Sequence, residues 1–314
     1  MSIDLITPPD RFVGLHAHST FSTFDGLGYP ADHIDFVLSE SQGMDAWALT
    51  DHGNGNGLAH AHSHAVKMQK AGRNFRQVYG VEFYFVPSLQ QWTEEYAAHR
   101  QAIKDAKTAA AAEKKAKEKI DIDADDEAEA GGLVVEDEDE TKKIDVLKDE
   151  WKRRYHLVVT ARNQQGLKNL FTLVKKSYKY GFYRYPRIDF KLLREHGEGL
   201  HVSTACLGGI YSNRILRGEV HGHSRNQIQD ELQNLTDQFV SCVGEDNFKL
   251  ELQFNKIGKQ HTVNDYLIEH HKQTGIQLIC TADSHYPTSD KWQARELYKK
   301  LGWLGKRDGL TLPE

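Results

Sequence analysis

Two histidines near the amino terminus, His16 and His18, are separated by one residue and follow an apolar run from Phe12 to Leu15. Such a run is typical of a short buried strand that enters a loop. Residues two apart in an extended chain point to the same side, so both imidazoles can face one point. This spacing favours a shared metal ion, and Asp25, which precedes a glycine, is a third residue nearby that can ligate metal. An isolated His-x-His also borders ordinary turns, so the prediction depends on partners elsewhere in the chain.

Further side chains of metal-ligand type stand at the ends of other short apolar runs. They are His52 in Thr-Asp-His-Gly, Glu82 in Gly-Val-Glu, His156, Cys206, and Asp283 with His285. Imidazole, carboxylate and thiolate donors together suit zinc, iron or manganese better than magnesium or calcium. A lone buried cysteine or histidine is usually a core residue, but recurrence at successive strand ends favours a common metal site.

The elements that must carry these side chains alternate along the sequence. The apolar runs span 12–15, 46–49, 77–86, 155–160, 200–203, 248–252 and 277–281, and the amphipathic stretches span 30–41, 57–71, 163–178, 207–216, 224–241, 260–274 and 289–301. Seven strands alternating with helices predict a parallel α/β sheet, and the unbroken repeat favours a closed barrel. In such barrels the chemistry lies where the parallel strands end, and that is where the ligand-type residues stand.

Composition sets further bounds. The chain has 314 residues, of which 39% are hydrophobic, enough for a sizeable core. No apolar stretch is long enough to cross a bilayer, and residues 1–11 contain prolines and acids rather than the apolar run of a signal peptide. We therefore expect a cytoplasmic protein with no membrane segment. Three cysteines, Cys206, Cys242 and Cys280, are too few for a disulfide framework.

Charge is distributed unevenly along the chain. Residues 104–150 carry seventeen acids and nine lysines, so the rest of the chain sums to +3 within the total of −5. Residues 97–116 contain nine alanines, which favours an exposed helix, and residues 121–140 hold eleven acids without a base, typical of a disordered stretch. We interpret 95–150 as an insertion, either a tolerated surface loop or an arm that docks a partner or repels nucleic acid.

Several longer strings resemble the polymerase and histidinol phosphatase (PHP) domain, in the version found at the amino terminus of bacterial C-family DNA polymerase III alpha subunits. They are Phe12 to Ser19 (FVGLHAHS), Thr50 to Gly53 (TDHG), Tyr180 to Asp189 (YGFYRYPRID), Cys206 to Gly209 (CLGG), Leu250 to Gln253 (LELQ) and Asp283 to Tyr286 (DSHY). The resemblance runs from about residue 11 to residue 290, without the insertion. It implies a PHP barrel at 1–290 and, at 291–314, a C-terminal helix and tail that form a junction to a polymerase.

The resemblance implies a distorted (β/α)7 barrel with a trinuclear metal centre at the carboxyl ends of its strands. The positions that match the family's nine ligands are His16, His18, Asp25, His52, Glu82, His156, Cys206, Asp283 and His285. All nine hold residues able to ligate, which implies two or three divalent ions of zinc, manganese or iron. Glu82 and Asp283 are expected to be shared, catalytic carboxylates. Asp51, also a catalytic candidate, is expected to fix the tautomer of an imidazole, or else to cap a strand end.

A basic and aromatic stretch bears on the substrate. From Lys175 to Arg187, five basic residues alternate with five aromatic ones. Positive side chains track phosphates and exposed rings stack on unpaired bases, so this composition suits a single-stranded 3′ end. The expected nucleic-acid contacts are Lys175, Lys176, Lys179, Tyr183, Arg184 and Arg187. The alternative is that the rings pack a loop against the barrel and the basic residues are ordinary surface.

The metal centre and the basic stretch together predict a function. Closely spaced cations activate water and neutralise a phosphoryl group under in-line attack, so phosphoester hydrolysis is the expected reaction. We therefore expect a metal-dependent phosphodiesterase, a 3′→5′ proofreading exonuclease on single-stranded or frayed DNA ends in DNA replication. Its expected partner is a polymerase core, in the same chain or as a separate subunit. A small-molecule phosphomonoesterase or pyrophosphatase, and a non-catalytic scaffold stabilised by metal, stay open as alternatives.

Overall fold

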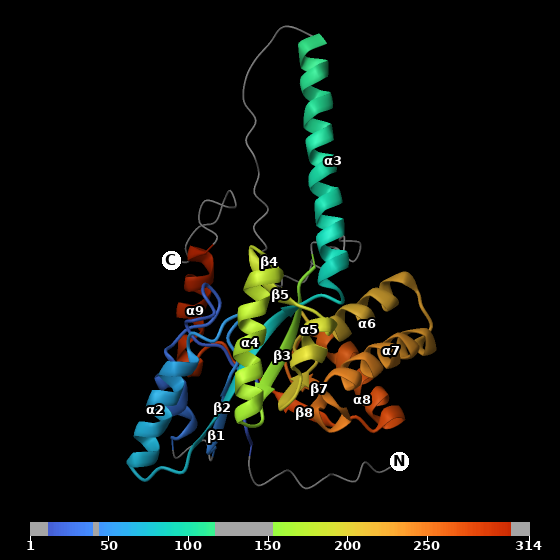
Figure 1. Cartoon of the computed structure of the whole chain (residues 1–314). Helices are drawn as coiled ribbons and strands as arrows, with labels where there is room; N and C mark the ends of the chain where they lie inside the picture. Colours follow the sequence, from blue (N-terminus) through green and yellow to red (C-terminus); the bar gives the residue numbers. More distant parts are fainter. Residues whose placement is uncertain (1–11, 40–43, 117–152, 303–314) are drawn as a thin grey trace.

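A computed structural model of the chain describes residues 12–39, 44–116 and 153–302. Its centre is a mixed sheet in the order β4-β5-β2-β3-β6-β7-β8, with β1 paired to β2 beside this path. The strands are β1 (Ala46–Leu49), β2 (Arg76–Phe85), β3 (Tyr155–Ala161), β4 (Phe182–Tyr183), β5 (Tyr185–Ile188), β6 (Leu200–Ser203), β7 (Phe248–Gln253) and β8 (Leu278–Thr281). Figure 1 shows helices on both sides of the curled sheet.

Local signals in the sequence set where the helices begin. The helices are α1 (Pro30–Val37), α2 (Leu58–Lys70), α3 (Leu89–Ala116), α4 (Gln164–Tyr180), α5 (Phe190–His196), α6 (Ile210–His221), α7 (Arg225–Val243), α8 (Gly258–Thr274) and α9 (Trp292–Leu301). The side chain of Asn163 accepts a hydrogen bond from the backbone N–H of Gly166 and so caps the start of α4. Gly166 is needed there, because a Cβ at this position would overlap the carbonyl of Gly199.

Six of the seven predicted strands form, each at or within one residue of its predicted bounds. The exception is 12–15, which forms no strand and takes part in the sheet through isolated bridges at Gly14 and Ala17. All seven predicted helices are present. The prediction missed the short elements β4, β5 and α5, because two to seven residues carry too little periodicity to be recognised.

The predicted all-parallel sheet is wrong at β3, which runs antiparallel to both β2 and β6. The chain leaves β2 at Phe85 and re-enters the sheet at Tyr155, and these two residues are paired in register. The connection therefore begins and ends at the same end of the sheet, as in a hairpin. A parallel β3 would need a crossover to the opposite end of the sheet.

The expected closed (β/α)7 barrel is also not what the described residues form. Their strands make a curled half-barrel whose path ends at β4 and β8. The segment around the His-x-His pair partly spans the open side, because Gly14 bridges to Trp47 of β1 and Ala17 bridges to Ser284 beyond β8. The backbone N–H of His18 donates to the Ser284 carbonyl at 2.7 Å. The paired histidines are thus held between the first and last strands.

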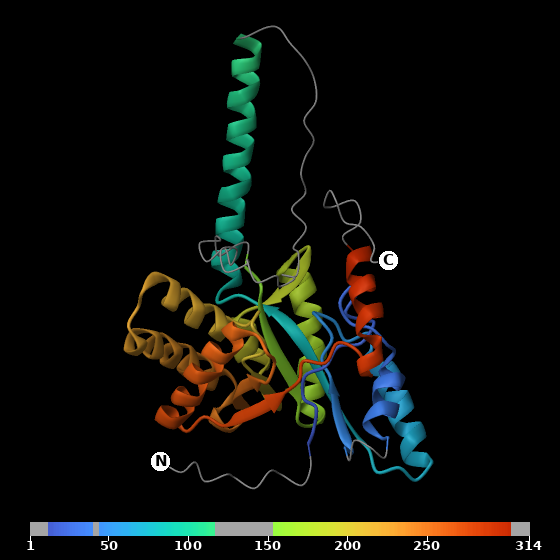
Figure 2. The same cartoon turned by 180° about the vertical axis from the view of Figure 1, so that it is seen from behind.

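Helix α3 projects away from the rest of the molecule, as Figures 1 and 2 both show. It is 28 residues long, and the predicted helix at 97–116 is confirmed as its outer part. The acidic stretch at 121–140 lies outside the described residues. Within the described ranges, no helix combines the length and apolar character needed to span a membrane.

A buried polar network around His270 joins α7 and α8. Gln229 donates its amide N–H to the Tyr266 carbonyl at 3.1 Å, so its amide oxygen faces His270 Nδ1 at 3.0 Å and places the proton on that nitrogen. The other ring nitrogen, Nε2, lies 2.8 Å from the Thr236 hydroxyl. Burial lowers the pKa of His270 to about 4.

We expect His270 to make the fold sensitive to acid. Between pH 6.5 and about pH 4 the unfolded chain takes up a proton at His270 that the folded chain does not, so the free energy of unfolding should fall by about 3 kcal/mol from this group. A His270→Gln variant should be less stable at pH 7 but show less of this pH dependence. Urea titrations at pH 7, 5.5 and 4.5 measure it, with the exposed His223→Gln as control. Parallel pH profiles for both variants would contradict the assignment.

Candidate metal centre

The ligand-type residues lie together at one end of the sheet, where the parallel strands end and the antiparallel β3 begins. His16 and His18 come from the segment between β1 and β8, His52 follows β1, Glu82 lies on β2, His156 on β3, Cys206 follows β6, and Asp283 and His285 follow β8. Asp25 reaches the cluster from the turns before α1. All nine are buried or partly buried.

Glu82 is at the middle of this cluster. Its Oε2 lies 2.7 Å from His52 Nδ1 and 3.3 Å from His18 Nε2. Its Oε1 lies 2.9 Å from His156 Nδ1 and 3.4 Å from His16 Nε2. One carboxylate therefore contacts four imidazoles, which is an arrangement suited to a ligand shared between metal ions.

When both rings are neutral, as ligation requires, the His-x-His pair directs unprotonated nitrogens to a common point. His16 Nδ1 donates to a carboxylate oxygen of Glu251 at 2.7 Å, and His18 Nδ1 donates to the Ser22 hydroxyl at 2.9 Å. A neutral imidazole has one N–H, so these bonds leave a lone pair on each Nε2. The two Nε2 atoms are 3.2 Å apart, and each lies 3.3 Å from Asp283 Oδ1. Three lone pairs directed at one point favour a cation between them.

A similar arrangement surrounds Asp25. Its Oδ2 lies 2.9 Å from His52 Nε2 and 3.1 Å from His285 Nε2. His285 Nδ1 donates to the backbone carbonyl of Asp283 at 2.7 Å, so its Nε2 also carries a lone pair toward Asp25. The rings of His18 and His285 are stacked with centroids 4.5 Å apart, which brings this second group against the first.

The donor set fits divalent metal ions. Three groups have ligand atoms within 4.8 Å of one another: His16 with His18 and Asp283, His18 with His52 and His285, and His52 with Glu82 and His156. Glu82 Oε2 and Asp283 Oδ1 are buried and have no hydrogen-bond partner among the described residues. A buried carboxylate oxygen without a partner is costly, and a bound cation would compensate it. Cys206 stands at the border of the cluster, with its Sγ 3.5 Å from His156 Nδ1.

Charges within the cluster shift one another's protonation. Burial alone would lower the pKa of His16, but the surrounding carboxylates, Asp283 foremost, outweigh burial and raise that pKa well above its usual value. Burial would likewise raise the pKa of Glu82, yet the surrounding imidazoles, led by His156, hold it well below its usual value. Burial and then Glu82 raise the pKa of the Cys206 thiol. Ligation by Cys206 therefore requires that a metal displace its proton.

Glu251 on β7 belongs to the site, although the sequence analysis did not single it out as functional. It is buried, and it accepts hydrogen bonds from His16 Nδ1 and from the hydroxyls of Ser203 and Thr281, both at 2.6 Å. These bonds fix the direction and the tautomer of the His16 ring. The available signal was an acid between two leucines, Leu250 and Leu252, in a strand where an inward charge is costly unless it is paired.

Asp51 orients His18 and not His52, its neighbour in the sequence. Its carboxylate accepts hydrogen bonds from the backbone N–H of Ser19 at 2.7 Å and from the hydroxyls of Ser19 and Ser22, both at 2.8 Å. Ser22 in turn accepts the Nδ1 proton of His18. Asp51 thus acts on the tautomer of His18 through one serine, and its catalytic role stays a prediction.

Strained backbone is concentrated around the cluster. Phe24, Ala205 and Asp283 have positive φ angles of 61°, 59° and 48°. The first two directly precede Asp25 and Cys206, and Asp283 is itself a ligand candidate. Such conformations cost roughly 1–3 kcal/mol each and persist where the surrounding structure requires one particular side-chain direction.

Helix α9 supplies a cation to the cluster, although the sequence analysis placed it outside the barrel. Arg295 Nη2 pairs with Asp25 Oδ1 at 2.5 Å, and its Nε donates to the Asp25 carbonyl at 2.9 Å. One oxygen of Asp25 is therefore held by the arginine while the other faces His52 and His285. The predicted division at residue 290 stays a prediction, but this contact joins the two sides of it.

Replacing Arg295 by alanine should lower metal affinity by about 10- to 100-fold, the usual cost of removing an outer partner of a metal ligand. Without the guanidinium, Asp25 can turn away from the two imidazoles. Competition with a fluorescent chelator measures the affinity without relying on turnover. Lys300→Ala, on the same helix, is the matched control and should bind metal like the unchanged chain. Equal affinities in the two variants would show that Arg295 does not position Asp25.

The residues predicted to contact nucleic acid lie on α4 and on the β4–β5 hairpin. Lys175, Lys179 and Arg184 are exposed, Tyr183 is partly buried, and Lys176 pairs with Glu195 at 3.3 Å. Arg184 occupies the turn of the hairpin with a φ of 59°. The geometry therefore leaves three of the predicted cations facing solvent.

Arg187 is 3% exposed and is an internal anchor of the same hairpin. Its Nη1 donates to the carbonyls of Tyr183 at 3.0 Å and Tyr185 at 2.9 Å, and its guanidinium lies 4.8 Å from the centre of the Trp92 ring. A guanidinium enclosed in this way exposes little of its surface to a phosphate in solvent. Its burial removes Arg187 from the proposed nucleic-acid contacts.

Comparison with protein families matches residues 14–255 to the PHP domain. Over 301 residues the chain is 29% identical to the DNA polymerase III subunit alpha of Borreliella burgdorferi, covering 95% of this chain and 20% of that protein. The DNA polymerase III subunit alpha of Aquifex aeolicus is 30% identical over 279 residues, covering 88% of this chain and 18% of that protein. The chain thus spans about a fifth of the length of these relatives.

Two solved structures were also matched. An amidohydrolase from Chromobacterium violaceum has 14% identity and a TM-score of 0.38, covering 91% of this chain and 96% of that chain. A protein from Bifidobacterium adolescentis, assigned by its description to the metal-dependent phosphoesterases, has 12% identity and a TM-score of 0.44, covering 89% of each chain. Both TM-scores are below 0.5, so neither supports a function here. The family match over residues 14–255, by contrast, covers most of the chain, which therefore belongs to the PHP domain family and is related to DNA polymerase III alpha subunits.

Proposed function

We propose that this chain hydrolyses phosphoesters with the help of bound divalent metal ions, and that it removes nucleotides from the 3′ end of single-stranded DNA. The observation that carries the proposal is the buried cluster of ligand-type side chains around Glu82. Membership of the PHP domain family and kinship with DNA polymerase III alpha subunits support it. A replicative polymerase, in the same chain or as a separate subunit, is the partner that this kinship favours.

The residues that would hold the ions are His16, His18, Asp25, His52, Glu82, His156, Asp283 and His285, with Cys206 at the border. Bound divalent ions supply Lewis-acid activation of a phosphoester and of the water that attacks it. The contribution of the chain itself is to hold the donors in place. Glu251 fixes the ring of His16, and Asp51 fixes that of His18 through Ser22.

Arg154 and two tyrosines form the rim of the metal centre. The ring of Tyr84 lies 5.8 Å from that of His52 and 5.6 Å from that of His156. The Arg154 guanidinium stands 4.2 Å above the Tyr185 ring and 6.0 Å from the Tyr84 ring. A guanidinium held by aromatic rings beside the ligands is suited to binding a phosphate oxygen. We assign Arg154, which the sequence analysis did not single out, to substrate positioning.

Next to this rim lies an exposed basic and aromatic surface. Tyr178 and Phe182 are 48% and 54% exposed, and their rings stack at 5.7 Å. The exposed cations Lys175, Lys179 and Arg184 lie in the same stretch of α4 and the hairpin. Exposed rings can stack on unpaired bases while the cations follow the phosphates. The hairpin also carries Tyr185, so this surface is continuous in the chain with the rim of the metal centre.

The direct test incubates the full chain with single-stranded DNA labelled at its 5′ end, in the presence of Mn²⁺, Zn²⁺ or a chelator. Stepwise, metal-dependent shortening from the 3′ end would support the proposal. Hydrolysis of small phosphate monoesters or pyrophosphate without DNA shortening would identify a small-molecule phosphatase instead. Metal that stabilises the fold without any turnover would identify a scaffold. Either of the last two results would overturn the exonuclease proposal.

Neutralising the exposed surface should weaken DNA binding but leave the metal chemistry intact. Log affinity decreases with log salt concentration. In a Lys179→Gln/Arg184→Gln variant this slope should become shallower by about 0.7 for each phosphate that the chain no longer neutralises. Hydrolysis of a small chromogenic phosphodiester should be unchanged, because neither residue lies in the ligand cluster. Fluorescence anisotropy with labelled oligonucleotides measures the slope, and Lys168→Gln, exposed on the same α4, is the control. An unaltered slope would remove this surface from the proposal.

A further inference from the structure

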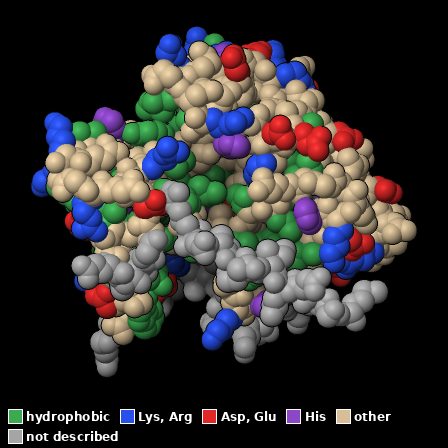
Figure 3. Space-filling model, turned by 90° about the horizontal axis from the view of Figure 1, so that it is seen from below, with side chains coloured by type: hydrophobic (Ala, Val, Ile, Leu, Met, Phe, Trp, Pro, Cys, Tyr) green, Lys and Arg blue, Asp and Glu red, His purple; other side chains and the backbone are tan. Residues whose placement is uncertain are grey.

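A cavity lies at the opposite end of the sheet from the metal centre. Its volume is about 680 Å³, and it is bordered by the starts of β2, β6 and β7 and by the end of the antiparallel β3. None of the nine ligand candidates lines it. Figure 3 views the molecule from this end and shows a central hollow with hydrophobic side chains in it and Lys, Arg and His side chains at its border. Cavities of this size commonly hold small molecules.

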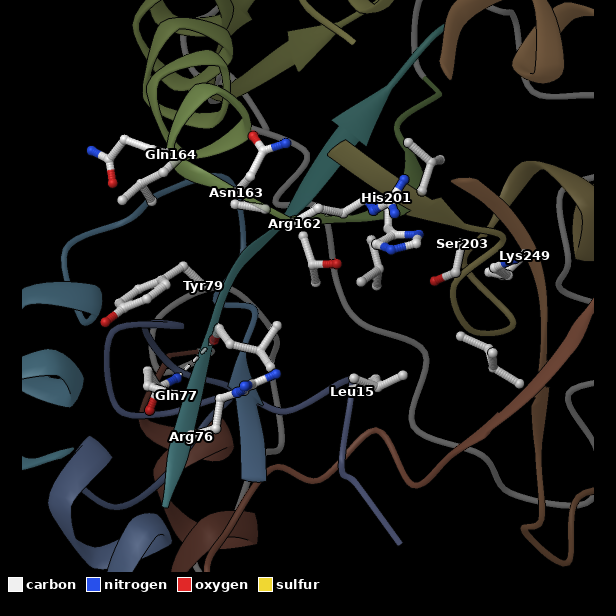
Figure 4. A pocket seen from close by; sticks show the side chains of 17 residues that line it. Leu15, Arg76, Gln77, Tyr79, Arg162, Asn163, Gln164, His201, Ser203 and Lys249 are labelled. Carbon is white, nitrogen blue, oxygen red and sulfur yellow. Dashed lines mark hydrogen bonds between the residues drawn. The ribbon is translucent and has the colours of Figure 1, made fainter. Parts of the chain in front are cut away.

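The polar side of the cavity is cationic. Arg76, Arg162, His201 and Lys249 line it, and Figure 4 shows Arg162 reaching toward His201. Burial lowers the pKa of His201, and the charges of Arg162 and Lys249 lower it further, which places the three groups near one another. No aspartate or glutamate is among the described residues that line the cavity, although Asp246 acts on Lys249 from outside it. The cations Arg76, Arg162 and Lys249, with the neutral imidazole of His201 as a hydrogen-bond donor, favour an anionic ligand.

The amino end of α4 adds to this field. Asn163 and Gln164, at the first turn of α4, also line the cavity. The Asn163 side chain takes up the N–H of Gly166, but the other first N–H groups of α4 have no partner within the helix and carry a partial positive charge that attracts anions. The cations and the helix end therefore attract the same negatively charged group of a ligand.

The remaining wall is apolar. Its side chains include Leu15, Val78, Val158, Leu167, Val202 and Ile279. A bare inorganic anion would leave this wall in contact with water, whereas an organic body attached to the anion would cover it. The combination of a cationic side and an apolar side thus matches an amphipathic molecule.

We propose that this cavity binds a small phosphorylated molecule with an apolar or aromatic body, of the size of a nucleoside monophosphate. The phosphate lies among Arg162, His201 and Lys249 near the first turn of α4, and the body lies against the apolar wall. The inference does not rest on the proposed function, because the cavity shares no residue with the ligand cluster.

Calorimetric titration of the full, metal-loaded chain with AMP, inorganic phosphate and adenosine tests the proposal. AMP should bind at one saturable site, phosphate should bind more weakly, and adenosine should show no measurable binding. In an Arg162→Gln/Lys249→Gln variant the affinity for AMP should fall by about tenfold or more, because two charge-assisted hydrogen bonds to the phosphate can no longer form. Arg76→Gln, at an exposed position, provides a second variant if the double variant melts at a lower temperature.

Two controls separate this cavity from the metal centre. Arg194→Gln/Lys256→Gln removes the same charge from exposed positions elsewhere and should bind AMP like the unchanged chain. In a Glu82→Ala background AMP binding should persist. Binding that disappears in Glu82→Ala but persists in Arg162→Gln/Lys249→Gln would place AMP at the metal centre and overturn the proposal. The absence of saturable binding up to millimolar AMP, or equal affinities for AMP and phosphate, would overturn it as well.

Discussion

Replacing Glu82 by alanine should reduce metal-dependent hydrolysis by about 10³-fold or more while the chain stays folded. Its carboxylate contacts the imidazoles of four histidines, so its removal disturbs several ligand groups at once. Metal stabilisation of a phosphoryl group under attack is worth several kcal/mol, and each factor of ten corresponds to about 1.4 kcal/mol. Initial rates on a chromogenic phosphodiester at saturating Mn²⁺ or Zn²⁺ give the size of the effect.

A second ligand variant and a surface variant complete this experiment. Asp283→Ala should show a decrease of similar size, because Asp283 Oδ1 faces both His16 and His18. Glu245→Ala removes an exposed carboxylate far along the chain from the cluster and should keep full activity. Circular dichroism reports whether each variant is folded, and elemental analysis reports its metal content. Full activity in folded Glu82→Ala would mean that the hydrolysis occurs at another site or in a contaminant.

Removing the metal should lower the melting temperature by roughly 10 °C at pH 7.5. Ions that bind the folded chain alone, at a thousand times their Kd, add about 4 kcal/mol to the free energy of unfolding. In a chain of this size each kcal/mol shifts the melting temperature by about 2–4 °C. Without ions, buried oxygens of Glu82 and Asp283 are left without hydrogen-bond partners among the described residues. Scanning calorimetry with and without a chelator measures the difference.

This metal-dependent shift should grow as the pH rises from 5.5 to 8. A ligating imidazole must be unprotonated, but the carboxylates around His16 outweigh burial and raise its pKa well above the usual 6.5 in the metal-free chain. Protonated His16 stabilises the metal-free chain fully below pH 6.5, and this contribution is lost as the pH rises through the raised pKa. Protons therefore compete with metal most strongly at low pH. A shift of the same size at every pH would contradict ligation by the histidines.

Features decided by a short stretch of residues could be predicted from the sequence. β1 and β6 form at their predicted bounds, because each is a short apolar run next to polar residues. The direction of β3 could not be predicted, since it depends on where the chain re-enters the sheet after residues 95–150. The charge and alanine content of that segment carry no information about its return point. The sequence repeat likewise could not show whether the sheet closes into a full barrel, because closure depends on bridges from Gly14 and Ala17 to distant segments.

The candidate site likewise contains residues that the sequence indicates and others that it does not. The nine ligand candidates could be expected from their residue types and from the resemblance to the PHP domain, and the structure brings them together, while ligation by each stays a prediction. Their partners could not be expected in this way: Glu251 is one acid within a strand, and Arg295 is one of 40 lysines and arginines. Arg187 gives the opposite case, because the composition of its stretch indicates a basic surface but does not tell which side chains face inward. Such partners are decided by contacts between distant segments.

The reversed direction of β3 makes this domain tolerant of change at one place in the chain. Phe85 and Tyr155 are paired, so the connection between these two strands begins and ends at the same point of the sheet. Such an excursion can become longer or shorter without shifting the register of β2 against β3. Glu82 and His156, which lie on these two strands, would keep their positions. The connection can therefore acquire, exchange or discard docking elements over evolution while the chemistry beside it is conserved.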